Sequence, residues 1–370
     1  MDKQMNEQRF LNRLIEIIQI DSPSLEEKEM SDYLIAFFKE RGEKVIADDT
    51  GKKFGSNGRN VLVHIPGSLN LEPICFNVHM DTVEPGRNIK PIKKNGRIIS
   101  DGSTILGGDD KAGIAMLLEG YEYLRENNIP HREMYFLFTL SEEIMQGAAH
   151  YDTSDIKVKY MFVLDGAGHP KYLCSASKGK TLLKYEFWGT TAHSGVDITA
   201  GRNAVCMAAH AITSMPTGLV DEDTTVNISS IHGGKEAPTV PDYAVVTAEI
   251  RSYYQDKIDD QAAVMHKAAK EAAELFEGRV SKEITILCPP YHAQTDEYLY
   301  KRTKEAIKDE GLDPVEIKTG GSSDANIFGE RGFICSGLGI GIHNVHTTSE
   351  YVDIEETQMA YRIMLNIMTN

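Results

Sequence analysis

The sequence predicts an α/β protein that carries a second, inserted α+β domain. Up to about residue 178, stretches with helical spacing of apolar residues alternate with short apolar strands, a pattern typical of a sheet covered by helices on both faces. Beyond Lys178 the strands alternate polar and apolar residues, and two helical stretches lie between them. With 370 residues the chain exceeds one typical core, so two domains are expected.

The first part of the chain is expected to begin with two helices. Apolar residues recur at helical spacing within residues 5–20. Ser24 and Glu27 have the spacing of a capping box, which predicts a second helix that ends near Gly42. Strands are then expected at 45–47, 60–65, 74–78, 134–140 and 160–164, a hairpin turn at 93–97, and a helix from Asp109 to about Asn127.

The inserted domain is expected to have the order β-α-β-β-α. Its strands are predicted at 181–188, 224–231 and 245–252, and its helices at 202–214 and 256–277. After Pro289 the chain returns to the first domain, with a helix at 296–310, strands at 315–318 and 333–338, and a last helix from about 354. The predicted divisions are therefore 1–178 and 291–370 for the first domain and 179–290 for the inserted one.

Composition narrows the classes of partner. Thirty-nine Lys and Arg against 55 Asp and Glu give a formal net charge of −16, which disfavours nucleic acid and anionic membranes. No apolar run approaches the roughly 20 residues of a membrane span, and the amino terminus has no apolar core of the signal type. Five scattered cysteines without a CxxC pair indicate buried thiols in a reducing compartment, so a cytoplasmic location is expected.

His79 and Asp81 end the strand expected at 74–78. Two residues apart on an extended chain, they project to the same side. A histidine that binds a metal usually donates its other ring N–H to an oxygen acceptor such as a carboxylate. This pair can supply both groups, although a polar strand end is the commoner explanation for such a pair alone.

Other polar residues also occur where strands end or helices begin. Asp109 and Asp110 follow two glycines at a helix start, Glu142 and Glu143 follow a strand, and Asp165 ends the next strand. Each of them alone is better explained as a helix cap or a solvated strand end, and a lone His346 would usually be structural. Because ligand sites of open α/β sheets lie beyond the carboxyl ends of the strands, we expect these residues to converge.

The expected donor set suits a pair of divalent ions. Two imidazoles (His79 and His346) and three carboxylates (Asp109, Glu143 and Asp165), without a thiolate, form a mixed N/O set of the kind that zinc-like ions accept. Two divalent ions would bring four positive charges against three carboxylates, so a bridging hydroxide would neutralise the site. Such a resting state is suited to hydrolysis.

The stretches HMD, GGDDKAG, SEE, VLD and HTTSE, in this order, resemble the M20 metallopeptidase family over nearly the whole chain. HMDT, GGDDKAGIA and GGSSDANIF resemble its peptidase T-like branch most. The resemblance implies a zinc-exopeptidase-like α/β catalytic domain with an inserted ferredoxin-like lid that also forms a homodimer. It also implies two Zn²⁺ per subunit, with Co²⁺ or Mn²⁺ as alternatives, and a cis peptide between Asp109 and Asp110.

The resemblance assigns roles to individual residues. His79 and Asp165 would hold one metal, Glu143 and His346 the other, and Asp109 would bridge both. Asp81 would orient His79. Glu142 would be the general base that takes a proton from the metal-bound water and later passes one to the leaving amine.

Three elements of the inserted part and its return are expected to meet the substrate. His193 matches an element whose histidine reaches the partner subunit's active site and steadies the oxyanion. Arg251 matches an arginine that binds a substrate carboxylate, and Gly321 and Ser322 are expected to contribute backbone groups. Pro238 is a departure, because many relatives have an Asn there that faces the substrate.

The predicted function is a di-zinc, aminotripeptidase-like hydrolase of small peptides. An amidohydrolase or deacylase of N-acyl amino acids is the first alternative. A two-metal phosphoesterase uses similar ligands, but its substrate would need several cations near the site, which the charge balance disfavours. A non-enzymatic binding protein that retains the fold would be favoured if Glu142 or a ligand were missing, and none is.

Overall fold

The computed structural model describes residues 6–235 and 238–370, which form two compact units. The first unit comprises the described residues up to Ala176 together with His292–Thr319 and Ser323–Asn370. The second comprises the described part of Ser177–Tyr291 and also Gly320–Ser322. The helix expected at 5–20 is observed as Glu7–Ile18, and Met5 lies outside the described residues.

The first unit is built on a mixed sheet with a parallel centre. Its strands run in the order β1-β2-β6-β3-β7-β16-β17-β5-β4. β3 is parallel to both β6 and β7, and β16 is parallel to β7, whereas the pairs toward both edges are antiparallel. β8 pairs with β14, β15 and β16. The strands are β1 (Lys44–Ala47), β2 (Val61–Ile65), β3 (Ile74–His79), β4 (Ile92–Lys94), β5 (Arg97–Ile99), β6 (Met134–Thr139), β7 (Tyr160–Ala167), β8 (Tyr172–Ser177), β14 (Tyr291–His292), β15 (Val315–Thr319), β16 (Ile334–His343) and β17 (Tyr351–Asp353).

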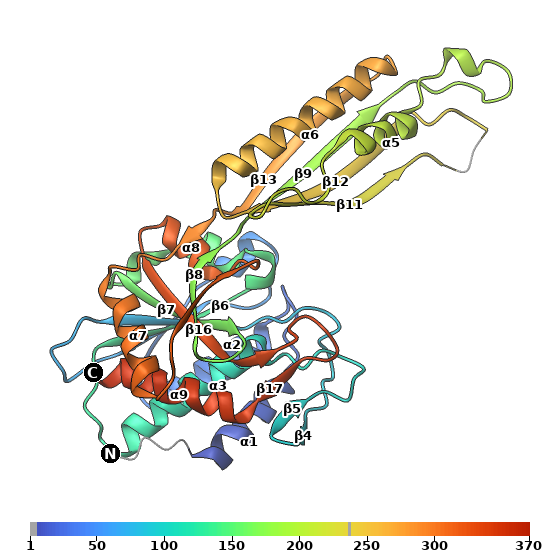
Figure 1. The fold of residues 1–370 in the computed structure, drawn as a ribbon. Helices are drawn as coiled ribbons and strands as arrows, with labels where there is room; N and C mark the ends of the chain where they lie inside the picture. Colours follow the sequence, from blue (N-terminus) through green and yellow to red (C-terminus); the bar gives the residue numbers. More distant parts are fainter. Residues whose placement is uncertain (1–5, 236–237) are drawn as a thin grey trace. The chain divides into compact units, whose positions relative to one another are not determined.

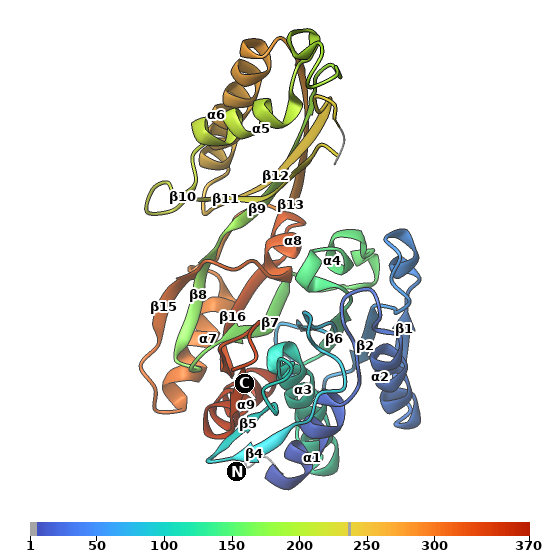
Figure 2. The ribbon, with the colours of Figure 1, turned by 90° about the vertical axis from the view of Figure 1, so that its right-hand side faces the viewer.

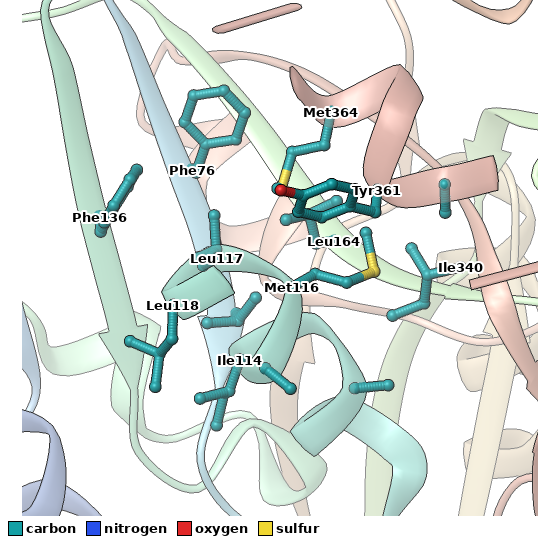
Figure 3. Packing of buried hydrophobic residues seen from close by; sticks show 14 of the residues in the cluster. Phe76, Ile114, Met116, Leu117, Leu118, Phe136, Leu164, Ile340, Tyr361 and Met364 are labelled. Carbon is teal, nitrogen blue, oxygen red and sulfur yellow. The ribbon is translucent and has the colours of Figure 1, made fainter. Parts of the chain in front are cut away.

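Helices cover this sheet, and the main core lies beneath them. Figure 3 shows Met116 and Leu117 of α3 together with Phe76 of β3 and with Tyr361 and Met364 of α9, all of them buried. α2 lies beside β1 and β2 (Figure 2). The helices of the unit are α1 (Glu7–Ile18), α2 (Lys28–Glu40), α3 (Gly108–Glu126), α4 (Gly147–His150), α7 (Tyr298–Asp309), α8 (Asp324–Glu330) and α9 (Ile354–Thr369), with 3₁₀ turns η1 (Thr50–Lys53), η2 (Glu142–Ile144) and η3 (Thr153–Asp155).

The second unit is an antiparallel sheet with two helices on one face (Figure 1). Its order β10-β11-β12-β9-β13 contains the strand order of a ferredoxin-like β-α-β-β-α-β unit. Leu183, Tyr185 and Phe187 alternate along β9 and are buried beneath the helices. The elements are β9 (Gly179–Trp188), η4 (Ile198–Ala200), α5 (Ala204–Ser214), β10 (Gly218–Leu219), β11 (Thr225–Gly233), β12 (Tyr243–Ser252), α6 (Gln255–Leu275) and β13 (Arg279–Cys288).

The predicted α/β fold class is confirmed, and several local expectations are corrected. The capping box was wrong: α2 begins at Lys28, and Ser24 Oγ donates instead to the carboxylate of Asp81. β7 continues past Asp165, because it stays paired with β16. Cys206 is exposed, so the thiols are not all buried. Among the described residues, every helix is too short or too polar to cross a membrane.

Candidate metal centre

The carboxyl ends of the parallel strands bring the predicted ligands together. His79 ends β3, Asp165 lies near the end of β7, and Glu143 follows β6 in the turn η2. His346 lies in the loop between β16 and β17 at φ +63°. Asp109 lies in the first turn of α3, which follows Gly107 at φ +70°, a left-handed conformation that glycine adopts without strain. Parallel strands end at one edge of the sheet, so chain segments far apart in sequence meet there.

One group of candidate ligands consists of His79, Asp109 and Asp165. One donor atom from each residue lies within 4.8 Å of the others. Nε2 of His79 is 3.2 Å from Oδ1 of Asp109 and 3.7 Å from Oδ1 of Asp165. The imidazole is 2% exposed, so this edge of the ring faces carboxylate oxygens and not solvent.

A second group consists of Asp109, Glu143 and His346, with the same limit of 4.8 Å between donor atoms. Nε2 of His346 is 3.3 Å from Oδ2 of Asp109 and 3.0 Å from Oε1 of Glu143. The two oxygens of the Asp109 carboxylate therefore face different groups. The peptide bond from Asp109 to Asp110 is cis.

Asp81 holds the other side of the His79 ring. Nδ1 of His79 lies 3.0 Å from the carbonyl oxygen of Asp81 and 3.3 Å from its Oδ1. A ring that donates its Nδ1–H to these oxygens keeps Nε2 free as an electron-pair donor. This arrangement is the usual one for a metal-binding histidine.

Buried charge provides a test of whether divalent ions fit this donor set. Burial and the negative charge of Asp109 raise the pKa of Asp165 to about 8. Hydrogen bonds that the His346 ring donates to the carboxylates of Asp109 and Glu143 raise the pKa of His346 to about 10. Both shifts reflect several carboxylates close together, at a mostly buried position for Asp165 and beside the exposed ring of His346. Cations of charge two would compensate the negative charge of these carboxylates, and the mixed N/O donors fit zinc-like ions.

Glu142 lies beside these groups but belongs to neither. It is 4% exposed, and its Oε1 is buried with no hydrogen-bond partner among the described residues. Burial, followed by the charge of Asp165, raises the pKa of its carboxyl group well above the usual range. Its backbone N–H donates to Oδ1 of Asp81 at 2.8 Å. Oε1 of Glu142 thus has no hydrogen-bond partner among the described residues, while Asp81 holds the backbone of Glu142 in place.

The remaining predicted site residues lie in the second unit. His193 is exposed, and its Nδ1 accepts the backbone N–H of Gly195. Arg251 Nε donates to Oε1 of Glu249 at 2.6 Å. Ser322 Oγ donates to the carbonyl of Lys178 at 2.7 Å, and Gly321 lies in the same unit.

Pro238, which stands where many relatives have an Asn, takes part in local backbone pairing. The carbonyl of Pro238 accepts the backbone N–H of Ser194 at 3.0 Å, and the backbone N–H of Val240 donates to the carbonyl of Ala192 at 2.8 Å. The segment around Pro238 therefore pairs with the His193 loop through backbone groups, which need no amide side chain.

The sequence reasoning gave no role to several buried polar side chains around the centre. Oδ2 of Asp110 accepts the backbone N–H of His79, and Nζ of Lys111 donates to the carbonyl of Ile20 at 2.7 Å. Asp324 accepts hydrogen bonds from Thr139 Oγ1 and Asn77 Nδ2. Asp110, Lys111 and Asp324 all lie inside the quoted motifs, and this position in the motifs was the sequence signal that could have identified them.

Glu350, the last residue of HTTSE, is the clearest of these supports. It is 1% exposed, and its Oε2 accepts the backbone N–H groups of Leu106 and Gly107, both at 2.8 Å. Its Oε1 accepts the backbone N–H of Asp109 at 3.0 Å. Glu350 therefore connects the His346 loop to the segment that carries Asp109.

Replacing Glu350 with Ala should lower the free energy of unfolding of the first unit by at least about 3 kcal/mol. It leaves three buried N–H groups without their acceptor, and each such group costs about 1–3 kcal/mol. Urea denaturation followed by circular dichroism measures the loss, and hydrogen exchange should quicken at amides 106, 107 and 109. The exposed Glu355→Ala is the matched control. Wild-type exchange at those amides in Glu350→Ala would contradict the expectation.

Known proteins of similar sequence and structure identify the family of this chain. Residues 75–370 match the family described as peptidase family M20/M25/M40. An uncharacterized Bacillus subtilis (strain 168) protein, YqjE, is 36% identical over 354 residues, 95% of each chain. The crystal structure of aminopeptidase PepT from Bacillus cereus is 34% identical, with a TM-score of 0.88 over 99% of this chain and 98% of that one. A tripeptidase structure from Staphylococcus aureus is 31% identical, with a TM-score of 0.92 and the same coverage.

Three observations indicate the same family. The family model matches most of the chain, relatives of nearly equal length are similar over almost all of it, and a mixed histidine–carboxylate centre lies at the sheet edge. The chain belongs to peptidase family M20/M25/M40, within which it is a peptidase T-like, metal-dependent exopeptidase.

Proposed function

We propose that this protein is an aminopeptidase of small peptides, with tripeptides as its preferred substrates, and that it works with two zinc ions. The observation that carries the proposal is a pair of ligand groups that share Asp109, next to the buried and unpartnered carboxylate of Glu142. Similarity to an aminopeptidase and a tripeptidase over almost the whole chain supports the substrate class.

Each residue has a defined task in this proposal. His79 and Asp165 would hold one ion, Glu143 and His346 the other, and Asp109 both. Bound there, the ions act as Lewis acids that polarise a carbonyl and lower the pKa of water. Glu142 accepts the proton of the attacking water and delivers one to the leaving amine. Asp81 keeps His79 in the tautomer that leaves Nε2 unprotonated.

A substrate panel tests the function. The purified protein, loaded with Zn²⁺, Co²⁺ or Mn²⁺, is assayed on a tripeptide, a dipeptide, an N-acetyl amino acid and nitrophenyl phosphate. Hydrolysis of the tripeptide should be fastest, should stop with a chelator and should return with added metal. Faster hydrolysis of the N-acetyl amino acid would show an amidohydrolase, and faster hydrolysis of nitrophenyl phosphate a phosphoesterase. Either result would overturn the proposal.

We also propose that the protein acts as a homodimer through its second unit and that His193 completes the partner's active site. Two apolar side chains close to His193 in sequence, Val196 and Ile198, are 81% and 60% exposed. Large exposed apolar side chains on one loop favour contact with another protein surface. An imidazole near the scissile carbonyl would stabilise charge that develops only in the transition state.

Mixing two inactive variants tests the action of His193 across the dimer. His193→Ala should lose about 10²–10³-fold in kcat, the usual effect of removing one such donor. A mixture of His193→Ala and Glu142→Gln should regain activity, because each heterodimer contains one site with both residues intact. Subunit exchange is verified with differently tagged chains. Exchange without recovery would show that His193 does not act in the partner's site.

The proposed location is the cytoplasm. All five cysteines are free, as expected of a reducing compartment. Fractionation of cells that produce the protein tests this, and recovery of the protein outside the cytoplasmic fraction would refute it.

A further inference from the structure

An N-terminal strap, defined here as residues 22–27, crosses the loop that follows β3. Ser22 Oγ donates to the carbonyl of Met80 at 2.8 Å, and the backbone N–H of Thr82 donates to the carbonyl of Ser22 at 3.0 Å. Ser24 Oγ donates to Oδ2 of Asp81 at 2.6 Å. The strap therefore holds the segment that carries Asp81, the residue beside the His79 ring.

Glu27, the last residue of the strap, reaches a second loop. It is fully buried, and its Oε1 accepts the backbone N–H of Ser141 at 2.9 Å and the Ser141 hydroxyl at 2.5 Å. The same oxygen accepts the backbone N–H of Leu25 at 3.1 Å. Oε2 accepts the hydroxyl of Ser56 at 2.7 Å. Although Glu27 precedes α2, its side chain makes no capping bond to that helix.

These contacts fix the turn from which Glu142 and Glu143 project. The backbone N–H of Ser141 donates to Glu27, and those of Glu142 and Glu143 donate to Asp81 at 2.8 and 3.3 Å. Ser141 itself has φ +46°, a left-handed conformation that a serine holds only when its surroundings impose it. The direction of the two glutamate side chains is set by this backbone.

We propose that Glu27 is a positioning residue for catalysis, which holds the Ser141–Glu143 turn so that Glu142 and Glu143 face the metal centre. The inference rests on the proposed function for the roles of these two glutamates. The strap holds two loops that lie 60 residues apart in sequence. It therefore fixes the position of Asp81, which supports the His79 ring, together with the position of Glu142, the proposed base. Displacing a catalytic group by about 1 Å can lower turnover about 10²-fold.

The role is geometric, and glutamine should fulfil it. The side-chain oxygen of a glutamine can accept the three hydrogen bonds that Oε1 accepts now, and its NH₂ group can donate to Ser56 Oγ. Alanine supplies none of them. Glu27→Ala and Glu27→Gln therefore separate the position of the turn from the charge of the carboxylate.

The test compares kcat and KM of metal-loaded Glu27→Ala, Glu27→Gln and Ser56→Ala on a tripeptide. Glu27→Ala should lose about 10–100-fold in kcat with KM within about twofold, and Glu27→Gln should restore kcat to within about threefold of wild type. Ser56→Ala is the matched control. It removes the hydrogen bond to Oε2 of Glu27, the oxygen that does not contact the turn, so its kcat and KM should match those of the wild type. Ser141→Ala, which removes the hydroxyl from the other side, should lose kcat in the same way and serves if Glu27→Ala does not fold.

A second measurement does not depend on turnover. Competition titration of the metal-free proteins with a fluorescent zinc chelator should show weaker binding of one zinc equivalent in Glu27→Ala, because Glu143 shares the turn. An unchanged kcat and unchanged zinc affinity in Glu27→Ala would overturn the inference. A kcat of Glu27→Gln as low as that of Glu27→Ala would also overturn the inference, because it would show that the negative charge of Glu27 matters and not only its position. If the wild-type protein hydrolyses no peptide, the proposed function fails, and the zinc titration still decides the position of the turn.

Discussion

Glu142→Gln should lower kcat about 10²–10⁴-fold while both metal ions stay bound. The side chain belongs to neither ligand group, so its replacement removes no ligand. Glutamine has nearly the same shape, and the backbone N–H of residue 142 still donates to Asp81. The variant loses only the ability to accept a proton from water.

The comparison with the next residue makes this experiment decisive. Glu143→Gln should lose metal from the group that contains His346, since Oε1 of Glu143 lies 3.0 Å from Nε2 of His346. Exposed Glu355→Gln serves as the control for the loss of one carboxylate elsewhere in the unit. Elemental analysis gives metal content, and steady-state kinetics gives kcat. Lost metal with near-normal kcat in Glu142→Gln would mean that the two glutamates have exchanged roles.

The fold was predictable because its central strands are buried on both faces. β3 and β6 are buried at every residue, and such apolar runs are visible in sequence. β13 was not predicted, because it is an edge strand whose residues are mostly exposed, so no buried apolar run marks it. α8 and β17 were missed because seven and three residues leave too little periodicity to recognise.

The candidate site was predictable at the level of motifs, and its supports were not. Sequence alone gives no physical reason to prefer Asp109 to Asp110 as a ligand, and the role of Asp109 as a ligand shared by both ions came from the family resemblance. In the structure Asp110 Oδ2 accepts the backbone N–H of His79, whereas Asp109 faces both imidazoles. The contacts of Glu27 with Ser141 and of Glu350 with Leu106 join residues 114 and 244 positions apart. They are bonds from carboxylates to backbone groups, which leave no local pattern in the sequence.

Asp109→Ala is expected to have the largest effect of the ligand substitutions. Its Oδ1 lies 3.2 Å from Nε2 of His79 and its Oδ2 3.3 Å from Nε2 of His346, so one substitution removes a ligand from both groups. Asp165→Ala and His346→Ala each remove a ligand from one group only and are the matched controls.

The metal content of these three variants should therefore differ in a defined way. Each control should keep one tightly bound equivalent, whereas Asp109→Ala should keep none after dialysis. Loss of both Lewis acids removes several kcal/mol of transition-state stabilisation, and about 4 kcal/mol corresponds to about 10³-fold in rate. Turnover of Asp109→Ala should fall by at least that factor. If Asp109→Ala retained two equivalents by elemental analysis, the carboxylate would not be shared between the ions, and the two groups would have to be independent sites.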